Sequence, residues 1–156
     1  MKLRAANLML GLSGDLSLSA DDRRNLAHLA VGGVILFARN FAAPAQLRQL
    51  TADIRRAAGR KIIIAADQEG GRVQRFCGGG FSPLPPMLRL GDADDLSLLR
   101  DAGAVMAAEL LAAGVDLSFA PVLDLARGRS QIIGDRAFAA DGETAAARAL
   151  AFADGM

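Results

Sequence analysis

Short apolar runs alternate with longer amphipathic segments along the chain. Four apolar runs have the length of buried strands, at residues 7–12, 34–37, 61–66 and 115–120. Most of them are apolar on both faces, which is typical of parallel strands covered on both sides. Four segments with helical spacing of apolar residues begin near residues 19, 44, 96 and 141. This alternation predicts a parallel α/β sheet.

The first two helices have the clearest start and stop signals. Ser19 followed by Asp21 and Asp22 predicts a helix start, because the hydroxyl can accept from a free backbone N–H and acidic residues favour the positive helix end. Pro44 suits the first turn of the second helix, and Gly59 predicts its end.

Glycine-rich stretches mark the expected breaks. The pair Gly32-Gly33 is expected to end the first helix, so that the second strand begins at Val34. Residues 68–91 are rich in glycine and proline and are expected to form one long loop, and residues 125–140 a second. A loop of this length in a compact domain usually has a function.

The strand pattern leaves two architectures open, a doubly wound sheet and part of a (β/α)₈ barrel. Both place ligands at the carboxyl ends of the strands. Four strands are too few to close a barrel, which typically needs about 250 residues. With 156 residues, the chain is expected to be one domain that stops partway through such a barrel.

Composition excludes several classes of protein. The chain is 52% hydrophobic and 22% charged with a net charge of +1, which excludes a disordered chain. A basic face for nucleic acid is not visible, and no apolar run reaches the length of a membrane span, so neither partner is expected. Cys77 is the lone cysteine and no secretory signal is convincing, which predicts a cytoplasmic protein.

The segment that follows the third strand carries the densest polar chemistry. Asp67 ends the strand, two glycines follow Glu69, and Arg75 can fold back beside Asp67. A carboxylate accepts and a guanidinium donates, and a polyol needs both kinds of partner. The alternative interpretation is a salt-bridged loop in which Asp67 or Glu69 pairs with Arg72 or Arg75.

Other polar positions are open to two interpretations. Arg136 lies on the loop after the fourth strand, at the same edge as Asp67, but could instead pair with Asp135 or Asp141. Asp124 could contact a ligand or cap nearby N–H groups. His28 is interpreted as structural, and one histidine with one cysteine gives no metal cluster. The glycines at 78–80 could bind an anion, but Phe81-Ser82-Pro83 follows them instead of a helix, which argues against a phosphate- or nucleotide-binding domain.

Four blocks of sequence carry a resemblance to a known family. Residues 67–76, DQEGGRVQRF, resemble the strand-three motif of bacterial β-N-acetylhexosaminidases of glycoside hydrolase family 3. Residues 31–40, 116–124 and 133–138 resemble the second-strand block, the fourth-strand block and an arginine-bearing loop of the same family. The order and spacing of all four blocks make the signal specific.

The resemblance implies a (β/α)₈ barrel, of which residues 1–156 would be the N-terminal half. It implies a retaining glycosidase that removes terminal N-acetylglucosamine from peptidoglycan fragments during cytoplasmic cell-wall recycling. The positions matching Asp67, Arg75 and Arg136 would hold the sugar's hydroxyl groups. No cofactor and no metal ion are implied.

The chain also departs from the family pattern. The family's acid/base histidine with its aspartate partner, its nucleophilic aspartate and a Lys-His block all lie beyond the fourth strand, and His28 does not match the acid/base position. Gly11 stands where relatives often carry an aspartate. Retaining hydrolysis needs a nucleophile and an acid/base group, so the 156 residues alone are expected to be inactive. The alternative function is a non-catalytic sugar-binding α/β module. Open sheet edges predict poor solubility or self-association.

Overall fold

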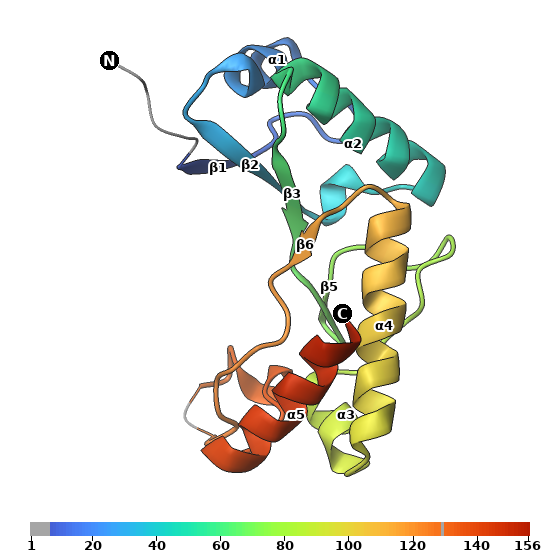
Figure 1. The fold of residues 1–156 in the computed structure, drawn as a ribbon, viewed down its shortest axis with the longest axis vertical. Helices are drawn as coiled ribbons and strands as arrows, with labels where there is room; N and C mark the ends of the chain where they lie inside the picture. Colours follow the sequence, from blue (N-terminus) through green and yellow to red (C-terminus); the bar gives the residue numbers. More distant parts are fainter. Residues whose placement is uncertain (1–6, 129) are drawn as a thin grey trace.

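The computed structural model describes residues 7–128 and 130–156, and it contains a parallel sheet (Figure 1). The sheet follows chain order: β1 (Leu8–Gly11), β2 (Val31–Leu36), β3 (Ile63–Ala66) and β6 (Leu117–Ser118). This order lacks the reversal of a doubly wound sheet, and it is the order of consecutive strands in a barrel. Within the described residues the sheet stays open, with β1 and β6 at its edges. The predicted parallel α/β architecture is confirmed.

Helices follow the strands as the apolar spacing predicts. The α-helices are α1 (Ala20–Ala27), α2 (Pro44–Ala58), α3 (Met87–Asp92), α4 (Leu96–Ala112) and α5 (Gly142–Gly155). The short 3₁₀ turns are η1 (Ala38–Asn40) and η2 (Gly134–Arg136). Ser19 caps α1, Pro44 opens α2, and Gly59 ends α2 in the left-handed conformation, as the sequence predicts.

The boundary predicted for the second strand is wrong. Gly32 and Gly33 do not end a helix but lie inside β2, which begins at Val31. Met9 of the neighbouring strand gives the reason, because a Cβ on Gly33 would stand 2.6 Å from its Cε. A glycine in the strand therefore makes room for the methionine on the adjacent strand.

The prediction of one long loop at residues 68–91 is also wrong. The chain forms an antiparallel hairpin of β4 (Gln68–Gly70) and β5 (Val73–Gln74), followed later by α3. Gly70 and Gly71 form the turn with φ values of +88° and +54°, which an L side chain rarely adopts. The short strands contain too few residues for a period-2 pattern to reveal them.

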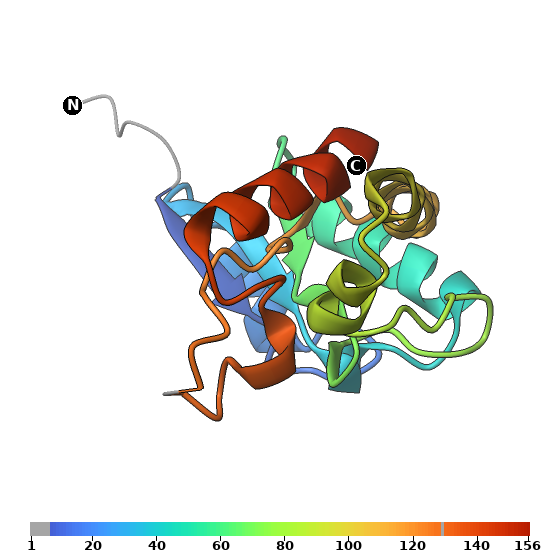
Figure 2. The same cartoon turned by 90° about the horizontal axis from the view of Figure 1, so that it is seen from below.

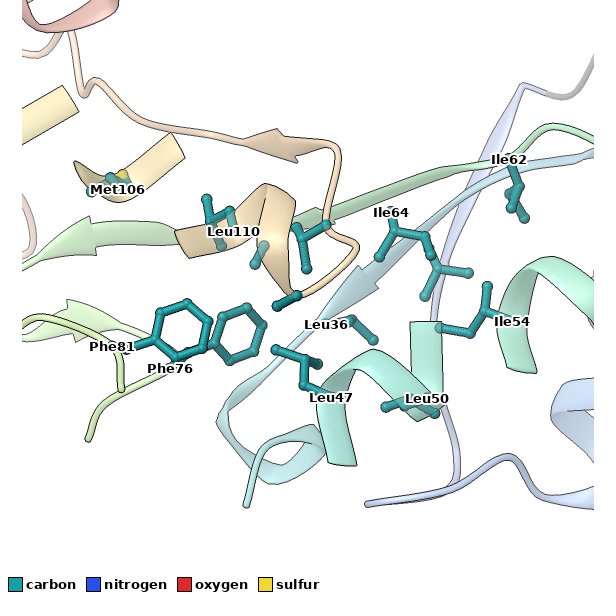
Figure 3. Packing of buried hydrophobic residues seen from close by; sticks show 14 of the residues in the cluster. Leu36, Leu47, Leu50, Ile54, Ile62, Ile64, Phe76, Phe81, Met106 and Leu110 are labelled. Carbon is teal, nitrogen blue, oxygen red and sulfur yellow. The ribbon is translucent and has the colours of Figure 1, made fainter. Parts of the chain in front are cut away.

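The core lies between the sheet and α2 and continues under α4 (Figure 3). Leu47, Leu50 and Ile54 form the buried stripe of α2, and they are almost fully excluded from water. Leu36 and Ile64 belong to the same buried cluster. Each such side chain stabilises the fold by about 1.5–3 kcal/mol relative to exposure.

Two further contacts complete the packing. The rings of Phe41, Phe76 and Phe81 form a cluster with centroid distances of 5.3–5.4 Å, which joins the 76–81 segment to the start of α2. The helices α4 and α5 lie side by side (Figures 1 and 2). They approach closely at Gly103, where a Cβ would stand 2.1 Å from the carbonyl oxygen of Phe152.

The loop that follows β1 is held by polar side chains on both sides. Asp22 accepts hydrogen bonds from the backbone N–H groups of Ser13, Gly14 and Ser19 at 2.8–3.0 Å. Asn40, fully buried, donates to the carbonyl oxygens of Gly14 and Asp15 at 3.1 and 2.8 Å. Burial by itself raises the pKa of Asp22, but these hydrogen bonds outweigh it and hold the pKa well below its ordinary value.

Candidate functional site

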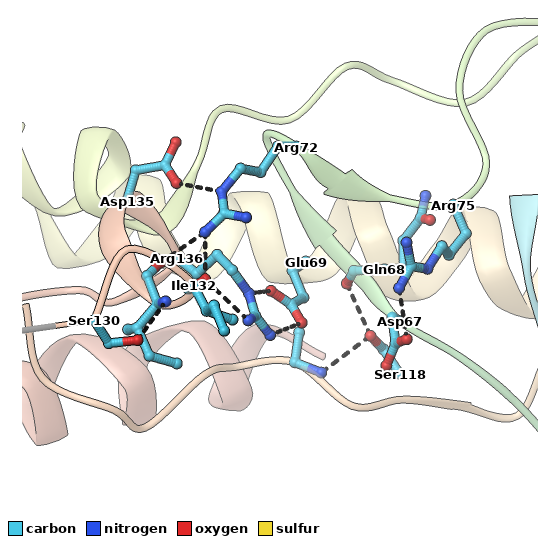
Figure 4. Close-up of polar contacts among 12 residues, drawn as sticks. Asp67, Gln68, Glu69, Arg72, Arg75, Ser118, Ser130, Ile132, Asp135 and Arg136 are labelled. Atoms are coloured by element: carbon cyan, nitrogen blue, oxygen red, sulfur yellow. Dashed lines mark hydrogen bonds and ion pairs between the residues drawn. The ribbon is translucent and has the colours of Figure 1, made fainter.

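Asp67 and Arg75 meet at the carboxyl end of β3. Asp67 directly follows that strand, and the hairpin register pairs Gln68 with Gln74, so that Asp67 and Arg75 are the next positions outward. The Nη2 of Arg75 donates to the Oδ2 of Asp67 at 2.9 Å. The predicted return of Arg75 beside Asp67 is confirmed (Figure 4).

Arg75 is fixed by its surroundings as well as by its ion pair. Its guanidinium lies 5.9 Å from the centre of the Phe37 ring, at the end of β2. Its Nε is buried and has no hydrogen-bond partner among the described residues. An unpaired buried donor costs about 1–3 kcal/mol.

Arg136 forms a second ion pair with Glu69 of the hairpin. The Nε of Arg136 donates to Oε2 of Glu69 at 2.7 Å, and its Nη2 donates to Oε1 at 2.8 Å. The Glu69 side chain is only 4% exposed and that of Arg136 22%. The hydrogen bonds that Arg136 donates to Glu69 raise its pKa against the opposing effect of burial, and the negative charges of Glu69, Asp67 and Asp124 raise it further.

A third pair joins the hairpin turn to the loop that carries Arg136. The Nε of Arg72 donates to Asp135 at 3.0 Å, and its Nη2 contacts the carbonyl oxygens of Gln131, Ile132 and Ile133. Side chains of residues 69–72 therefore hold the 131–136 loop through ion pairs and hydrogen bonds (Figure 4).

These contacts test the ion-pair interpretations that the sequence left open. Asp67 and Arg75 do form a salt bridge, as one interpretation expected. The interpretation that Arg136 pairs with Asp135 or Asp141 is wrong: Asp135 pairs with Arg72, and Asp141 caps α5 by accepting from the N–H of Thr144. Within residues 7–128 and 130–156, no N–H donates to Asp124, so a capping role for it is not found.

The role of Glu69 is not apparent from the sequence. The local pattern indicates Arg72 or Arg75 as its partner, whereas the actual partner, Arg136, lies 67 positions further along the chain. The acidic side chain beside a double glycine indicates that Glu69 has a special role, but local spacing cannot identify a partner so far along the chain.

Arg39 adds a further cation to the same edge of the sheet. It lies in η1 after β2, donates to the carbonyl oxygen of Leu12 at 2.9 Å, and stands 5.0 Å from the Phe37 ring centre. A Cβ on Gly11 would lie 3.3 Å from the Phe37 ring, so the absence of a side chain at Gly11 lets the ring approach the strand closely. Phe37 therefore has Arg39 and Arg75 close to its ring.

The remaining candidates lie away from this edge or serve packing. His28 is exposed at the C-terminal cap of α1. The glycines at 78–80 form a turn that closes a bridge between Gly78 and Phe81. Across the part of the chain that the structure describes, no cluster of three or more His, Cys, Asp or Glu side chains could hold a metal ion. In that same part, no helix has the length and apolar character to cross a membrane.

The arrangement offers donors and acceptors in pairs of nearly balanced charge. Asp67 with Arg75 and Glu69 with Arg136 place carboxylate oxygens and guanidinium N–H groups at one edge of the sheet. A neutral polyol can use both kinds of group.

Comparisons with known proteins agree with this geometry. The model of the glycosyl hydrolase family 3 N terminal domain matches residues 4–156. A beta-hexosaminidase of Nitrosomonas eutropha is 51% identical over 155 residues, covering 96% of this chain and 44% of the relative. Among solved structures, native NagZ from Neisseria gonorrhoeae superposes with a TM-score of 0.91 at 41% identity, covering 96% of this chain and 45% of that one.

A second Neisseria gonorrhoeae structure, NagZ in complex with N-trifluoroacetyl-D-glucosamine, has the same TM-score of 0.91 and 41% identity, and covers 96% of this chain and 46% of that one. The chain spans about half the length of the relatives it matches. Both the family model and the relatives cover nearly all of the 156 residues. The chain therefore belongs to glycosyl hydrolase family 3: residues 4–156 match the N-terminal domain of that family, and their fold is TIM-barrel-like.

Proposed function

We propose that the edge bearing Asp67, Arg75 and Arg136 binds a terminal N-acetylglucosamine residue, as part of a β-N-acetylhexosaminidase. The two arginine–carboxylate pairs at the carboxyl ends of the strands carry this proposal, because Asp67 can accept from sugar hydroxyls while Arg75 and Arg136 can donate to them. The beta-hexosaminidase relatives and the related complex with N-trifluoroacetyl-D-glucosamine support it. The saccharide substrate would be a peptidoglycan fragment, and the setting cytoplasmic cell-wall recycling.

We further propose that the 156 residues bind this sugar without hydrolysing it. Retaining hydrolysis needs a nucleophile on one side of the scissile bond and an acid/base group on the other. Asp67 and Glu69 both face arginines, and the single histidine, His28, lies at the end of α1 away from them. Polar groups that can bind a sugar, without a catalytic pair beside them, are what a sugar-binding module would have. This arrangement supports binding without turnover by this chain alone.

A fluorine-labelled sugar tests the binding proposal. We expect the ¹⁹F resonance of N-trifluoroacetyl-D-glucosamine to broaden or shift when the chain is added. Asp67→Asn should abolish the effect, whereas the control Asp53→Asn, in an ion pair on α2, should leave it unchanged. An equal response from the wild type and Asp67→Asn would overturn the assignment of Asp67.

A chromogenic N-acetylglucosaminide tests the second proposal. We expect no release of the chromophore by the 156-residue chain. Turnover that this chain supports and that Asp67→Ala abolishes would show that the chain holds a complete catalytic apparatus.

A further inference from the structure

The carboxylate of Glu69 is buried and bound by Arg136, so it is not accessible to a sugar. Both of its carboxylate oxygens accept from Arg136, at 2.7 and 2.8 Å, and its side chain is almost completely buried. A bidentate pair of this kind fixes the plane of the guanidinium as well as its position. The contribution of Glu69 to the site is therefore made through Arg136.

Counting the donors of Arg136 shows what the pair leaves available. A guanidinium has one N–H on Nε and two on each Nη. Glu69 takes the Nε donor and one donor of Nη2, and the carbonyl oxygen of Ile132 accepts from Nη1 at 3.3 Å. One donor on Nη1 and one on Nη2 remain, and these two can bind two neighbouring oxygen atoms of one ligand.

The backbone around Glu69 is held in place independently. A Cβ on Gly70 would stand 2.6 Å from the carbonyl oxygen of Pro85, and one on Gly71 would stand 2.7 Å from Cβ of Pro86, so the hairpin turn packs closely on residues 84–86. The hydroxyl of Ser118 donates to the carbonyl oxygen of Gln68 at 2.8 Å and ties the hairpin to β6. Glu69 therefore projects from a closely packed turn whose first strand is hydrogen-bonded to β6.

We infer that Glu69 is a positioning residue that orients Arg136, so that two guanidinium donors remain available to the sugar. The part of this inference that concerns the ligand rests on the proposed function. The part that concerns Arg136 does not, because the ion pair exists without a ligand. Arg72 assists by holding the carbonyl groups of the same loop, but its side chain is half exposed and its contacts are to Asp135 and backbone oxygens.

The state of Arg136 can be measured directly in the 156-residue chain by ¹⁵N NMR of the arginine Nε–H groups. We expect the Nε–H of Arg136 to exchange slowly with water in the wild type. Glu69→Gln should make this exchange fast, and Glu69→Asp, which keeps the charge, should restore part of the protection. Glu109→Gln is the matched control, because Glu109 also anchors a loop, accepting from the N–H and hydroxyl of Ser82, but does not touch Arg136.

Affinity for N-acetylglucosamine provides the second measurement. We expect Glu69→Gln to weaken binding roughly tenfold, Arg136→Ala to weaken it at least as much, and the double variant to show little further loss. Glu109→Gln should bind as the wild type does.

The two measurements separate failure of this inference from failure of the proposed function. Absence of binding to the wild type, with slow Arg136 exchange that depends on Glu69, would reject the sugar and retain the positioning role. Binding that needs Asp67 but is unchanged in both Glu69→Gln and Glu69→Asp would reject the positioning role. Fast exchange of the Arg136 Nε–H in the wild type would also reject it.

Discussion

The guanidinium of Arg75 donates to the carboxylate of Asp67 at 2.9 Å, and the β4–β5 hairpin makes this contact possible. The two residues are eight positions apart, and the double glycine between them reverses the chain. The ion pair therefore couples the end of β3 to the returning strand.

Replacement of Arg75 by lysine should weaken binding of N-acetylglucosamine. Lysine keeps the charge but loses the planar donor set and its position beside Phe37, so we expect roughly tenfold lower affinity by calorimetry. Arg24→Lys, in an exposed ion pair on α1, is the control and should bind as the wild type does. Unchanged affinity in Arg75→Lys would mean that Arg75 does not contact the sugar.

Gly70→Ala should destabilise the chain more than Gly59→Ala does. Both glycines have positive φ, but a Cβ on Gly70 meets the carbonyl oxygen of Pro85 while one on Gly59 meets nothing within 4 Å. We expect a loss of about 1 kcal/mol for Gly59→Ala and of at least about 2 kcal/mol for Gly70→Ala in urea unfolding. Equal losses would contradict the close packing of the hairpin turn.

Asp22→Asn should destabilise the chain in a pH-dependent way. The pKa of Asp22 is lowered in the folded state, so its charged form adds stability at pH values above the unfolded pKa of about 3.9. As the pH falls below that value towards the folded pKa, this contribution is lost. The wild type should therefore exceed Asp22→Asn by on the order of 2 kcal/mol near pH 7, and the difference should shrink below about pH 4.

Urea unfolding at several pH values checks this prediction. Asp21→Asn provides the matched control, because Asp21 is exposed on the same helix and, among the described residues, forms an ion pair with Arg24 alone. A difference between wild type and Asp22→Asn that grows as the pH falls would contradict the assigned direction of the pKa shift.

One face of the open sheet exposes apolar side chains. The register places Met9 beside Gly33, Gly33 beside Ile63, and Ala65 beside Leu117, so these positions share the face opposite the buried Ile64. Met9, Ile63 and Leu117 are all exposed. Together with the edges of β1 and β6, which pair with no further strand in the described part of the chain, this face should drive self-association of the 156-residue chain.

Sedimentation velocity over a concentration series measures this association. Ile63→Lys should shift the chain towards monomer, whereas Leu150→Lys, which changes an exposed leucine of α5, should not. A wild-type chain that stays monomeric at every concentration would contradict the prediction.

The sequence predicts the strands and helices well where local signals are strong. Ser19, Pro44 and Gly59 mark helix ends through their own chemistry, and the structure confirms all three. The sequence-based predictions fail where a contact between residues far apart in the chain determines the local structure or the ion-pair partner. At Gly33 the glycine lies within a strand, because the side chain of Met9 occupies the space where a Cβ would be. Glu69 pairs with an arginine from another loop. Neither partner is visible from local spacing.

The most direct test of the central claim is a map of the backbone amide signals that N-acetylglucosamine shifts in the NMR spectrum of this chain. We predict that the shifted signals cluster at residues 67–75 and 131–136, and that Asp67→Asn removes the shifts. Shifts confined to the opposite end of the strands, around Arg55 and Asp116, or an unchanged spectrum at saturating sugar, would contradict the claim that Asp67, Arg75 and Arg136 form the sugar site.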